Sequence, residues 1–399
     1  MVSTREQYET YPYPERDPAD EAKRLITGSP SHPLEIDHHL FGGARDWSQP
    51  LRALVAGGGT GDGLIQLAQV LTNAGAPFDI TYVDLSTASR AVAEARAQAR
   101  GLTGIRFHTG SLLDAPDYGQ FDYIDCCGVL HHLPQPEEGF KALRAALAPG
   151  GGLGFMVYAP YGRSGVYPLQ EAFGALFDGV DAETRLRQAR DIVAALPKGH
   201  PFATNPNLGD HTQSDAGFYD LLLHGQDRSY DIPQLLDVLD QTGWRLQGFP
   251  TPALYDLSRI APRPGGLSDA KAMEVAEKLH GTLKMHIAYA VPAGDTRKPA
   301  KGSNRQLVPH LRGVQPRALA QAVAQGKPIP VTLPELRTTL RLPREAAALI
   351  AGIDGKRTLA QIAQGARLDP LAFGAQWSKL ERDLVDWGLL LYSNLGRKG

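Results

Sequence analysis

The feature that most constrains the fold is a glycine-rich segment, LVAGGGTGDG, at residues 54–63. It begins inside a short apolar run and leads into GLIQLAQVLTNAG, in which apolar residues recur at helical spacing. Gly57, Gly59 and Gly61 form a GxGxG turn, where glycine permits unusual dihedral angles and lets a ligand approach the backbone closely. The helix behind the turn offers free N–H groups at its start. The segment therefore predicts a strand–turn–helix unit that holds a ligand, with a tight turn that holds none as the alternative.

The segments that follow alternate between strand-like and helix-like patterns. FDITYVDLS, IRFHTGS, FDYIDCC and GLGFMVYA are predicted strands, and RAVAEARAQARG and EEGFKALRAALAPGG are predicted helices. This alternation predicts an α/β fold with a parallel, doubly wound sheet. We place this domain at residues 46–296, with helical insertions at about 160–230 and 253–282. Between and after the insertions, IPQLLDVLDQTGWRLQGF predicts helix, glycine stop and strand, and KMHIAYAVP predicts the last strand.

Two further units flank this domain. Residues 1–45 are polar and marked by prolines, and we interpret them as an N-terminal arm. After a polar, basic linker at 297–306, residues 307–399 predict a small winged-helix-like α+β domain, because TLAQIAQGARLDPLAFGAQWSKLERDLVDWGLLLYS suggests helix, turn, helix and a short strand. Protein interaction, homodimerisation and packing against the first domain remain open as its role.

Composition excludes several classes of protein. The 41 Lys and Arg residues are balanced by 43 Asp and Glu residues, so we do not expect a broad basic field that binds nucleic acid. We expect neither a secretory signal nor a membrane span, since no apolar stretch approaches the roughly 18 residues that a span requires. The two cysteines, Cys126 and Cys127, are adjacent, and we expect both to pack as small buried residues in a reducing cytoplasm.

Asp84 is a second candidate ligand-binding residue beside the glycine turn. It ends the second predicted strand, where a carboxylate can accept hydrogen bonds from ribose hydroxyls. The alternative is that Asp84 caps the helix that follows. A nicotinamide-binding turn would need GxGxxG, but Asp62 occupies the sixth position, so we do not favour hydride transfer.

Several segments in order resemble the class I, Rossmann-like S-adenosylmethionine-dependent methyltransferases. Gly57-Gly58-Gly59-Thr60-Gly61 resembles the first motif of that family, Asp84 its ribose-binding acid, and Gly110-Ser111-Leu112-Leu113 its adenine-contacting segment. FDYIDCCGVLHHLPQPEEGFKALRAALAPGGGL resembles the next motif, helix and Pro-Gly-Gly turn. YPYPER (11–16), CCGVLHHL, YGRSGVY and LLHGQDRSY are similar to a bacterial subgroup. The resemblance implies S-adenosyl-L-methionine as cofactor and S-adenosyl-L-homocysteine as product.

The resemblance also assigns positions to the cofactor. Ser111 and Leu112 would flank adenine, and Cys127 and Gly128 would lie near the methionine part. The family's usual acid two residues before the first glycine is Val55 here, and its usual adenine-contacting Asp is Ser111, so we expect backbone carbonyls or the arm to hold the amino group. The expected cofactor-binding residues are Tyr11, Tyr13, Arg16, Gly57, Gly58, Gly59, Gly61, Asp62, Asp84, Leu85, Gly110, Ser111, Leu112, Cys127 and Gly128.

The N-terminal arm is expected to act as a lid. Tyr11 and Tyr13 lie in its proline-stiffened part, where their rings could stack on the cofactor or exclude water, and Arg16 could hold a carboxylate. The alternative is an ordered arm that packs on the surface.

Candidate catalytic residues follow the fourth and fifth predicted strands. His131 and His132 come after the fourth strand, where one could act as a general base or orient the acceptor, and Tyr158 ends the fifth. The alternative for each histidine is a hydrogen bond to the loop backbone. We expect no metal site, because adjacent side chains diverge and no spaced His, Cys or Asp set accompanies them, and we interpret His38 and His39 as structural.

The acceptor is expected to contact two polar segments. Arg163 follows the fifth strand and suits an anionic group, with a structural ion pair as the alternative. LLHGQDRSY places many polar groups beside an apolar run and could form a substrate wall or a capping network. The expected substrate-contacting residues are Tyr161, Arg163, His224, Gln226, Arg228 and Tyr230.

Three functions remain open at this point. The chain could methylate a protein or peptide side chain, with the C-terminal unit as a docking module. It could instead methylate a small molecule inside a closed pocket, or bind S-adenosylmethionine as a non-catalytic regulator.

Overall fold

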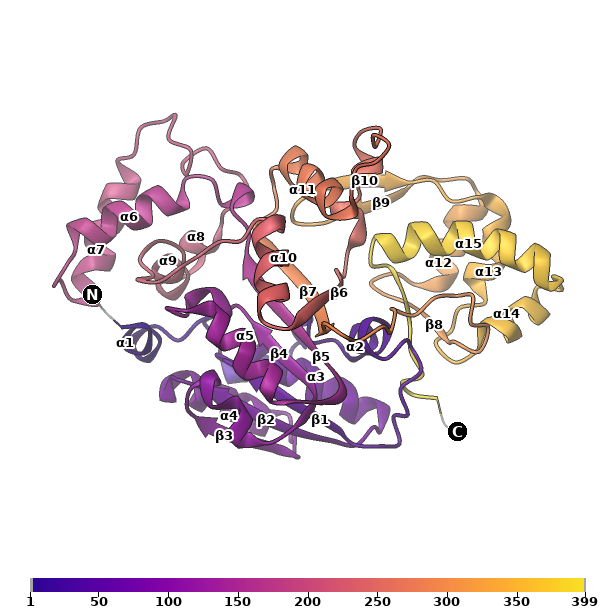
Figure 1. Cartoon of the computed structure of the whole chain (residues 1–399), viewed down its shortest axis with the longest axis horizontal. Coiled ribbons are helices and arrows are strands. Elements are labelled where there is room, and N and C mark those ends of the chain that lie inside the picture. Colours follow the sequence, from indigo (N-terminus) through magenta and orange to yellow (C-terminus); the bar gives the residue numbers. More distant parts are fainter. Residues whose placement is uncertain (1–2, 398–399) are drawn as a thin grey trace.

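The computed structural model describes residues 3–397 and has a seven-stranded sheet at its centre, in the order β3-β2-β1-β4-β5-β7-β6 (Figure 1). The strands are β1 Leu51–Ala56, β2 Phe78–Asp84, β3 Ile105–Thr109, β4 Phe121–Cys127, β5 Leu147–Tyr158, β6 Trp244–Gly248 and β7 Met285–Pro292. Strands β1 to β5 run parallel, which confirms the predicted α/β, doubly wound fold. The expectation of a wholly parallel sheet was incomplete, because β7 pairs antiparallel with both β5 and β6.

Helices cover both faces of the sheet because successive strand residues point to opposite sides. In β1, Ala53 and Val55 pack with α2 and α3, whereas Leu54 and Ala56 pack on the opposite face with α5 and α10. The helices of this part are α1 Thr4–Thr10, α2 Pro33–Leu40, α3 Asp62–Ala74, α4 Thr87–Ala99, α5 Pro136–Ala145 and α10 Ile232–Gln241. Because β1 to β5 run parallel, their carboxyl ends share one edge of the sheet, and this edge carries the candidate site.

Two helical insertions follow β5 and β6. The first contains α6 Val166–Leu176, α7 Ala182–Ala194, α8 Asp210–Gln213 and α9 Asp215–Leu222, and it lies beside the carboxyl ends of the strands (Figure 1). Helices α6, α7 and α9 share a hydrophobic cluster. The second contains the 3₁₀ helices η5 Pro252–Tyr255 and η6 Leu257–Arg259, and α11 Asp269–His280. None of the helices in residues 3–397 is long and apolar enough to cross a membrane.

Residues 309–392 form a C-terminal unit with a separate core. Its elements are β8 Pro309–Leu311, α12 Pro316–Ala324, β9 Ile329–Thr332, β10 Arg337–Leu340, α13 Ala347–Ala351, α14 Leu359–Gly365, α15 Pro370–Asp386 and β11 Leu390–Tyr392. Strands β9 and β10 form one antiparallel pair, and β8 and β11 form another. The likeness of this unit to a winged-helix domain stays a prediction.

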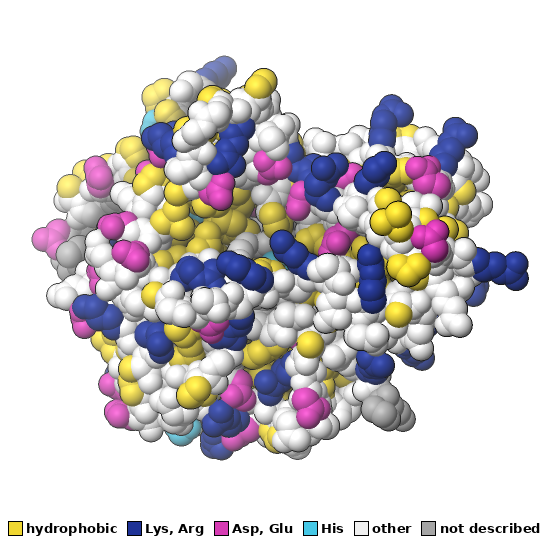
Figure 2. Space-filling model, turned by 45° about the vertical axis from the view of Figure 1, so that its right-hand side comes forward, with side chains coloured by type: hydrophobic (Ala, Val, Ile, Leu, Met, Phe, Trp, Pro, Cys, Tyr) yellow, Lys and Arg dark blue, Asp and Glu magenta, His cyan; other side chains and the backbone are white. Residues whose placement is uncertain are grey.

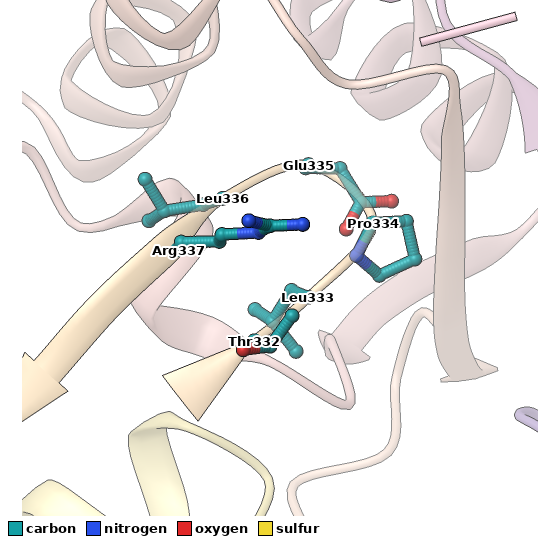
Figure 3. Close-up of a pocket in the computed structure, with 6 residues that line it drawn as sticks. All are labelled: Thr332, Leu333, Pro334, Glu335, Leu336 and Arg337. Atoms are coloured by element: carbon teal, nitrogen blue, oxygen red, sulfur yellow. The ribbon is translucent and has the colours of Figure 1, made fainter. Parts of the chain in front are cut away.

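The C-terminal unit contacts the first domain at several places, including an ion pair between Arg259 and Asp386. At α2, the His38 Nδ1 atom accepts a hydrogen bond from the Tyr392 backbone N–H at 3.2 Å. The turn between β9 and β10 places Leu333 and Leu336 against the cores of both units. A hollow of about 400 Å³ lies at this turn, lined by residues 332–337 (Figure 3). This hollow is formed by a hairpin turn and not by the carboxyl ends of the strands, so it is separate from the candidate site.

Charges of both signs are interspersed on the face shown in Figure 2, around a hollow in which hydrophobic side chains are visible. This distribution agrees with the balance of 41 basic and 43 acidic residues in the sequence.

Candidate cofactor and acceptor site

The glycine turn has a backbone that only glycine tolerates. Gly57, Gly59 and Gly61 have φ angles of 70°, 52° and 99°, in the left-handed region. A Cβ atom added at Gly57 would lie 2.4 Å from a methyl carbon of Val129, and one added at Gly59 would lie 2.9 Å from the Tyr13 carbonyl oxygen. The turn therefore needs glycine for its conformation and for the close approach of neighbouring segments.

Asp84 ties the glycine turn to the end of β2. Its Oδ2 atom accepts the Gly59 N–H at 2.8 Å, and its Oδ1 atom accepts the Ser86 N–H at 2.8 Å. Ser86, and not Asp84, caps α4 by accepting the Ser89 N–H. Burial raises the pKa of the Asp84 carboxyl. Each carboxylate oxygen has a second lone pair, so the side chain can still accept hydrogen bonds from a ligand.

The N-terminal arm lies across this edge of the sheet. Glu9 of α1 accepts hydrogen bonds from the Thr87 and Ala88 backbone N–H groups at the start of α4. Farther along the arm, the Thr60 hydroxyl donates to the Pro14 carbonyl oxygen at 2.6 Å. The arm therefore contacts both the glycine turn and the helix that follows Asp84.

The same arm also contacts the first insertion. Tyr11 stacks on Tyr219 of α9 with ring centroids 5.1 Å apart, and the Tyr8 hydroxyl donates to Asp220 Oδ1 at 2.8 Å. Tyr13 is partly buried. The arm thus joins the glycine turn to the insertion, and the role of Tyr11 and Tyr13 at a cofactor stays a prediction.

Arg16 and Asp62 are engaged with each other. The Arg16 Nε and Nη2 atoms donate to Asp62 at 2.9 Å and 2.6 Å. Asp62 also accepts from Arg96 Nη1 at 2.7 Å. In this structure the charges of these two predicted cofactor-binding residues hold the arm in place.

Two exposed leucines follow neighbouring strands. Leu85, after β2, is 39% exposed, and Leu113, after β3, is 44% exposed. Leu112 is buried in the core, so its side chain is not available to a ligand as the family resemblance implies. Ser111 caps the 3₁₀ helix η2 (Leu112–Tyr118), and a Cβ atom at Gly110 would meet the Tyr118 hydroxyl. Leu85 and Leu113 therefore present accessible apolar side chains at this edge.

The expectation that both cysteines are buried was wrong for Cys127. Cys126 points into the core, whereas Cys127, the last residue of β4, is exposed. Desolvation nevertheless raises the pKa of the Cys127 thiol, because surrounding atoms crowd it. Gly128 follows Cys127 with a φ of 80°.

Sequence reasoning missed Asp125 on β4. Asp125 lies opposite Val55 of β1 in the parallel register, and its Oδ2 atom is 3.4 Å from the position of a Cβ atom added at Gly63. Burial raises the pKa of Asp125 to about 6. The neighbouring strand thus places a buried carboxyl group beside Val55, beneath the start of α3. The only signal in the sequence is an aspartate inside the apolar strand FDYIDCC.

The structure gathers three histidines at this edge. His131 and His132 lie on the 3₁₀ helix η3 (Leu130–His132), with 1% and 5% exposure and ring centroids 4.1 Å apart. The His224 ring stacks on His132 at 3.8 Å. Burial lowers the pKa of His131 and His224 well below the ordinary value. The premise that adjacent histidines diverge was wrong, because η3 turns both rings toward the first insertion.

Two aspartates complete this group. Atoms of His131, His132 and Asp227 able to bind a metal lie within 4.8 Å of one another, and so do those of His132, Asp220 and His224. The premise that no such set accompanies the histidines was therefore also wrong. The set cannot be recognised in the sequence because the first insertion supplies Asp220, His224 and Asp227.

Arg163 forms the structural ion pair that sequence analysis kept as the alternative. It is 3% exposed and donates to Asp227 Oδ2 at 2.8 Å. Its guanidinium lies 3.6 Å from the ring centroid of Tyr158, whose hydroxyl donates to Asp220 Oδ2 at 3.1 Å. Burial raises the pKa of Tyr158. These contacts fasten the insertion to the end of β5.

The other predicted substrate residues are spread out. Gln226 and Arg228 are exposed, and Arg228 pairs with Glu137 at 3.2 Å. Tyr230 is buried in the main core, and Tyr161 is partly buried. The side chains of Arg163 and His224 lie with those of His131, His132 and Tyr158, whereas Gln226, Arg228 and Tyr230 contact these three residues through backbone atoms.

Comparison with known proteins agrees with this geometry. Residues 54–153 match the family described as "Methyltransferase domain". An uncharacterised protein of a Synechococcus strain is 36% identical over 205 residues, covering 50% of this chain and 48% of that protein. Highly reducing polyketide synthase 40 of Fusarium pseudograminearum is 31% identical over 117 residues, covering 28% of this chain and 4% of that protein. The chain thus spans about half or less of the length of these curated relatives.

Among solved structures, PKMT2 from Rickettsia typhi is similar over 93% of this chain and 77% of its own, with a TM-score of 0.63 and 17% identity. The structure of PKMT2 in complex with AdoHcy gives the same score and identity, with 76% of that chain covered. These likenesses show a shared fold. Residues 54–153 therefore have the sequence of a methyltransferase domain, within a chain that has a Rossmann-like methyltransferase fold.

Proposed function

We propose that this chain binds S-adenosyl-L-methionine at the carboxyl ends of β1, β2 and β4 and transfers its methyl group to an acceptor beneath the first insertion. The observation that carries the proposal is the glycine turn at 57–61 fastened to the Asp84 carboxylate. The match of residues 54–153 to a methyltransferase domain supports it, as does the fold shared with a protein that binds AdoHcy.

The residues of this edge have separate roles in cofactor binding. The left-handed glycines let the cofactor approach the backbone, and Asp84 accepts hydrogen bonds from its ribose hydroxyls. Leu85 and Leu113 offer apolar surfaces to the adenine ring, and the exposed Cys127 at the end of β4 contacts the methionine part. The arm covers the cofactor from outside.

The acceptor lies on the side of Tyr158, His131 and His132. The sulfonium methyl group is already activated, so the protein mainly has to align the acceptor, exclude water and manage a proton. The insertion and the arm cover these side chains, which are all less than 9% exposed. This enclosure favours an acceptor whose reacting group enters alone, either a small molecule or a single side chain of a peptide that the C-terminal unit helps to dock.

The direct test is a transfer assay with methyl-labelled S-adenosylmethionine and fractionated bacterial extract. Label in the protein fraction supports a protein or peptide acceptor, and label in small molecules supports a metabolite. Cofactor binding without transfer would instead favour a non-catalytic regulator. Binding of NAD with no binding of S-adenosylmethionine would refute the proposal.

A paired substitution on β2 tests the cofactor site. Asp84→Asn removes the charge that ribose hydroxyls contact, and hydrogen bonds to a charged group contribute about 1.5–3 kcal/mol, so we expect cofactor affinity to fall roughly 10- to 100-fold. The control Asp79→Asn lies at the other end of the strand, where Asp79 pairs with Arg106 at 3.0 Å near the surface. Calorimetric titration should show unchanged affinity for the control. Equal affinities for both variants would remove Asp84 from the site.

A further inference from the structure

The cluster of His131, His132, His224, Asp220 and Asp227 contains more unpaired polar atoms than a buried site normally keeps. Both ring nitrogens of His131, the Nε2 atoms of His132 and His224, and Asp227 Oδ1 are buried without a hydrogen-bond partner. Buried polar groups are nearly always paired, and each unpaired atom here needs an explanation. Several such atoms in one place point to a missing common partner.

The hydrogen bonds of the rings show which nitrogens can accept. His132 Nδ1 lies 2.8 Å from the Gln226 carbonyl oxygen, so Nδ1 carries the proton and Nε2 presents its lone pair to the cluster. A metal-binding histidine is commonly oriented in this way, with its other ring nitrogen donating to a carbonyl. His224 has the opposite arrangement, because its Nδ1 atom accepts the Gln226 N–H at 3.1 Å and its Nε2 atom therefore carries the proton.

The two carboxylates also differ. Both oxygens of Asp220 accept tyrosine hydroxyls, from Tyr8 and Tyr158. Asp227 uses only Oδ2, for Arg163 and Gln170, and leaves Oδ1 free. Asp227 therefore keeps one buried carboxylate oxygen without a partner, and this oxygen suits a bound cation.

We propose that His131, His132 and Asp227 bind a divalent transition-metal ion, with Zn²⁺ as the first candidate. Their ligand-capable atoms lie within 4.8 Å of one another. With bonds of about 2.0–2.2 Å, the ligand atoms of a tetrahedral zinc ion are about 3.4 Å apart. Modest side-chain rotation would bring the three ligand atoms to this distance from one another. Two imidazoles and one carboxylate suit zinc, iron or cobalt better than the all-oxygen sites of calcium and magnesium.

The burial of these atoms favours an ion over an organic group. The unpaired atoms are buried, so an organic molecule would have to open the cluster to reach them. A metal ion, in contrast, can be bound by the ligand atoms of the cluster alone. Three protein ligands leave at least one coordination position open, as in catalytic zinc sites. The inference goes beyond the proposed function and does not depend on it.

The test uses the full chain purified without a polyhistidine tag. Bound metal is measured by mass spectrometry after removal of free ions, and the stripped protein is then titrated with Co²⁺, whose visible absorption reports its ligands, and with Zn²⁺ in competition. We expect one ion for each chain. His131→Gln, His132→Gln and Asp227→Asn should each weaken binding about 100-fold or more, since loss of an outer-shell partner alone typically costs 10- to 100-fold.

Two controls keep the test decisive. His280→Gln, on α11 outside the cluster, should bind the metal as the unchanged chain does. Asp227→Asn could fail to fold because it leaves Arg163 without its counter-charge, so the two histidine variants also test the site. Absence of bound metal in the unchanged chain, or equal affinity in every variant, would overturn the proposal. Loss of binding in His224→Gln with retention in Asp227→Asn would overturn the ligand set.

Measuring S-adenosylmethionine affinity on the same samples separates the two proposals. Metal binding without cofactor binding would refute the proposed function and leave the metal site standing. Cofactor binding without metal binding would do the reverse.

Discussion

A buried ion network holds the N-terminal arm on the first domain, and breaking it should have a large, measurable cost. Glu21, in the 3₁₀ helix η1 (Pro18–Ala22), has a side chain only 4% exposed and accepts hydrogen bonds from Arg96 Nε at 2.6 Å and from Arg100 Nε. Arg96 is 1% exposed, and it also donates to the Thr60 carbonyl oxygen in the glycine turn at 2.8 Å. The network therefore couples the arm to the turn.

The expected cost of Glu21→Gln follows from these contacts. Hydrogen bonds to charged groups contribute about 1.5–3 kcal/mol each, and removing one partner of a buried pair costs about 3–5 kcal/mol. The glutamine oxygen keeps one weaker bond, and Arg96 retains Asp62 as a counter-charge. We therefore expect the free energy of unfolding to fall by about 3 kcal/mol, near the lower limit.

The assay is urea unfolding of the full chain, followed by circular dichroism, with Glu94→Gln as the matched control. Glu94 lies on α4, as Arg96 does, but its pair with Arg90 is about one-third exposed on each side, so its loss should cost less than about 1 kcal/mol. Cofactor affinity should fall in Glu21→Gln because the glycine turn loses part of its support. Equal destabilisation by the two substitutions would refute the claim that burial makes the Glu21 network strong.

Two further predictions concern the glycine turn and the contact between the units. Gly57→Ala should destabilise the chain by about 1–3 kcal/mol more than Gly75→Ala, because both residues have left-handed φ angles but only a Cβ atom at Gly57 would overlap a neighbour. Comparison of the thermal unfolding midpoints of the two variants checks this, and equal midpoints would contradict it. Burial lowers the pKa of His38 to about 4. Between about pH 6.5 and pH 4, His38 therefore binds a proton in the unfolded chain but not in the folded one. The contribution of His38 to the free energy of unfolding is complete above this pH range and is lost as the pH is lowered through it. Between pH 7 and pH 5 the chain should lose about 2 kcal/mol more than His38→Gln, measured by urea unfolding; the same loss in both proteins would show that His38 is not held neutral.

The sequence by itself determined the order of the elements and the position of the candidate site at the carboxyl ends of the strands. Strand alternation, helical spacing and the glycines at 57, 59 and 61 are local properties, because each depends on residues a few positions apart. They sufficed to predict β1 to β5, the helices between them and the place of Asp84 at the end of β2. The sequence pattern of a strand does not specify which strands it pairs with or in which direction it runs. The antiparallel β7 between β5 and β6 was therefore not predicted.

Only the tertiary structure decided which side chains meet at that edge. Asp125 lies beside Val55 through the register of two strands, and His132 contacts the Gln226 carbonyl oxygen across 94 positions of sequence. Such contacts depend on how an insertion packs against a sheet, and the pattern within either segment does not specify that packing. Arg163 likewise became a structural anchor because α9 and the loop after it bring Asp227 to it. The sequence therefore determined where a ligand can bind, and the packing of the insertion and the arm determined which groups surround it.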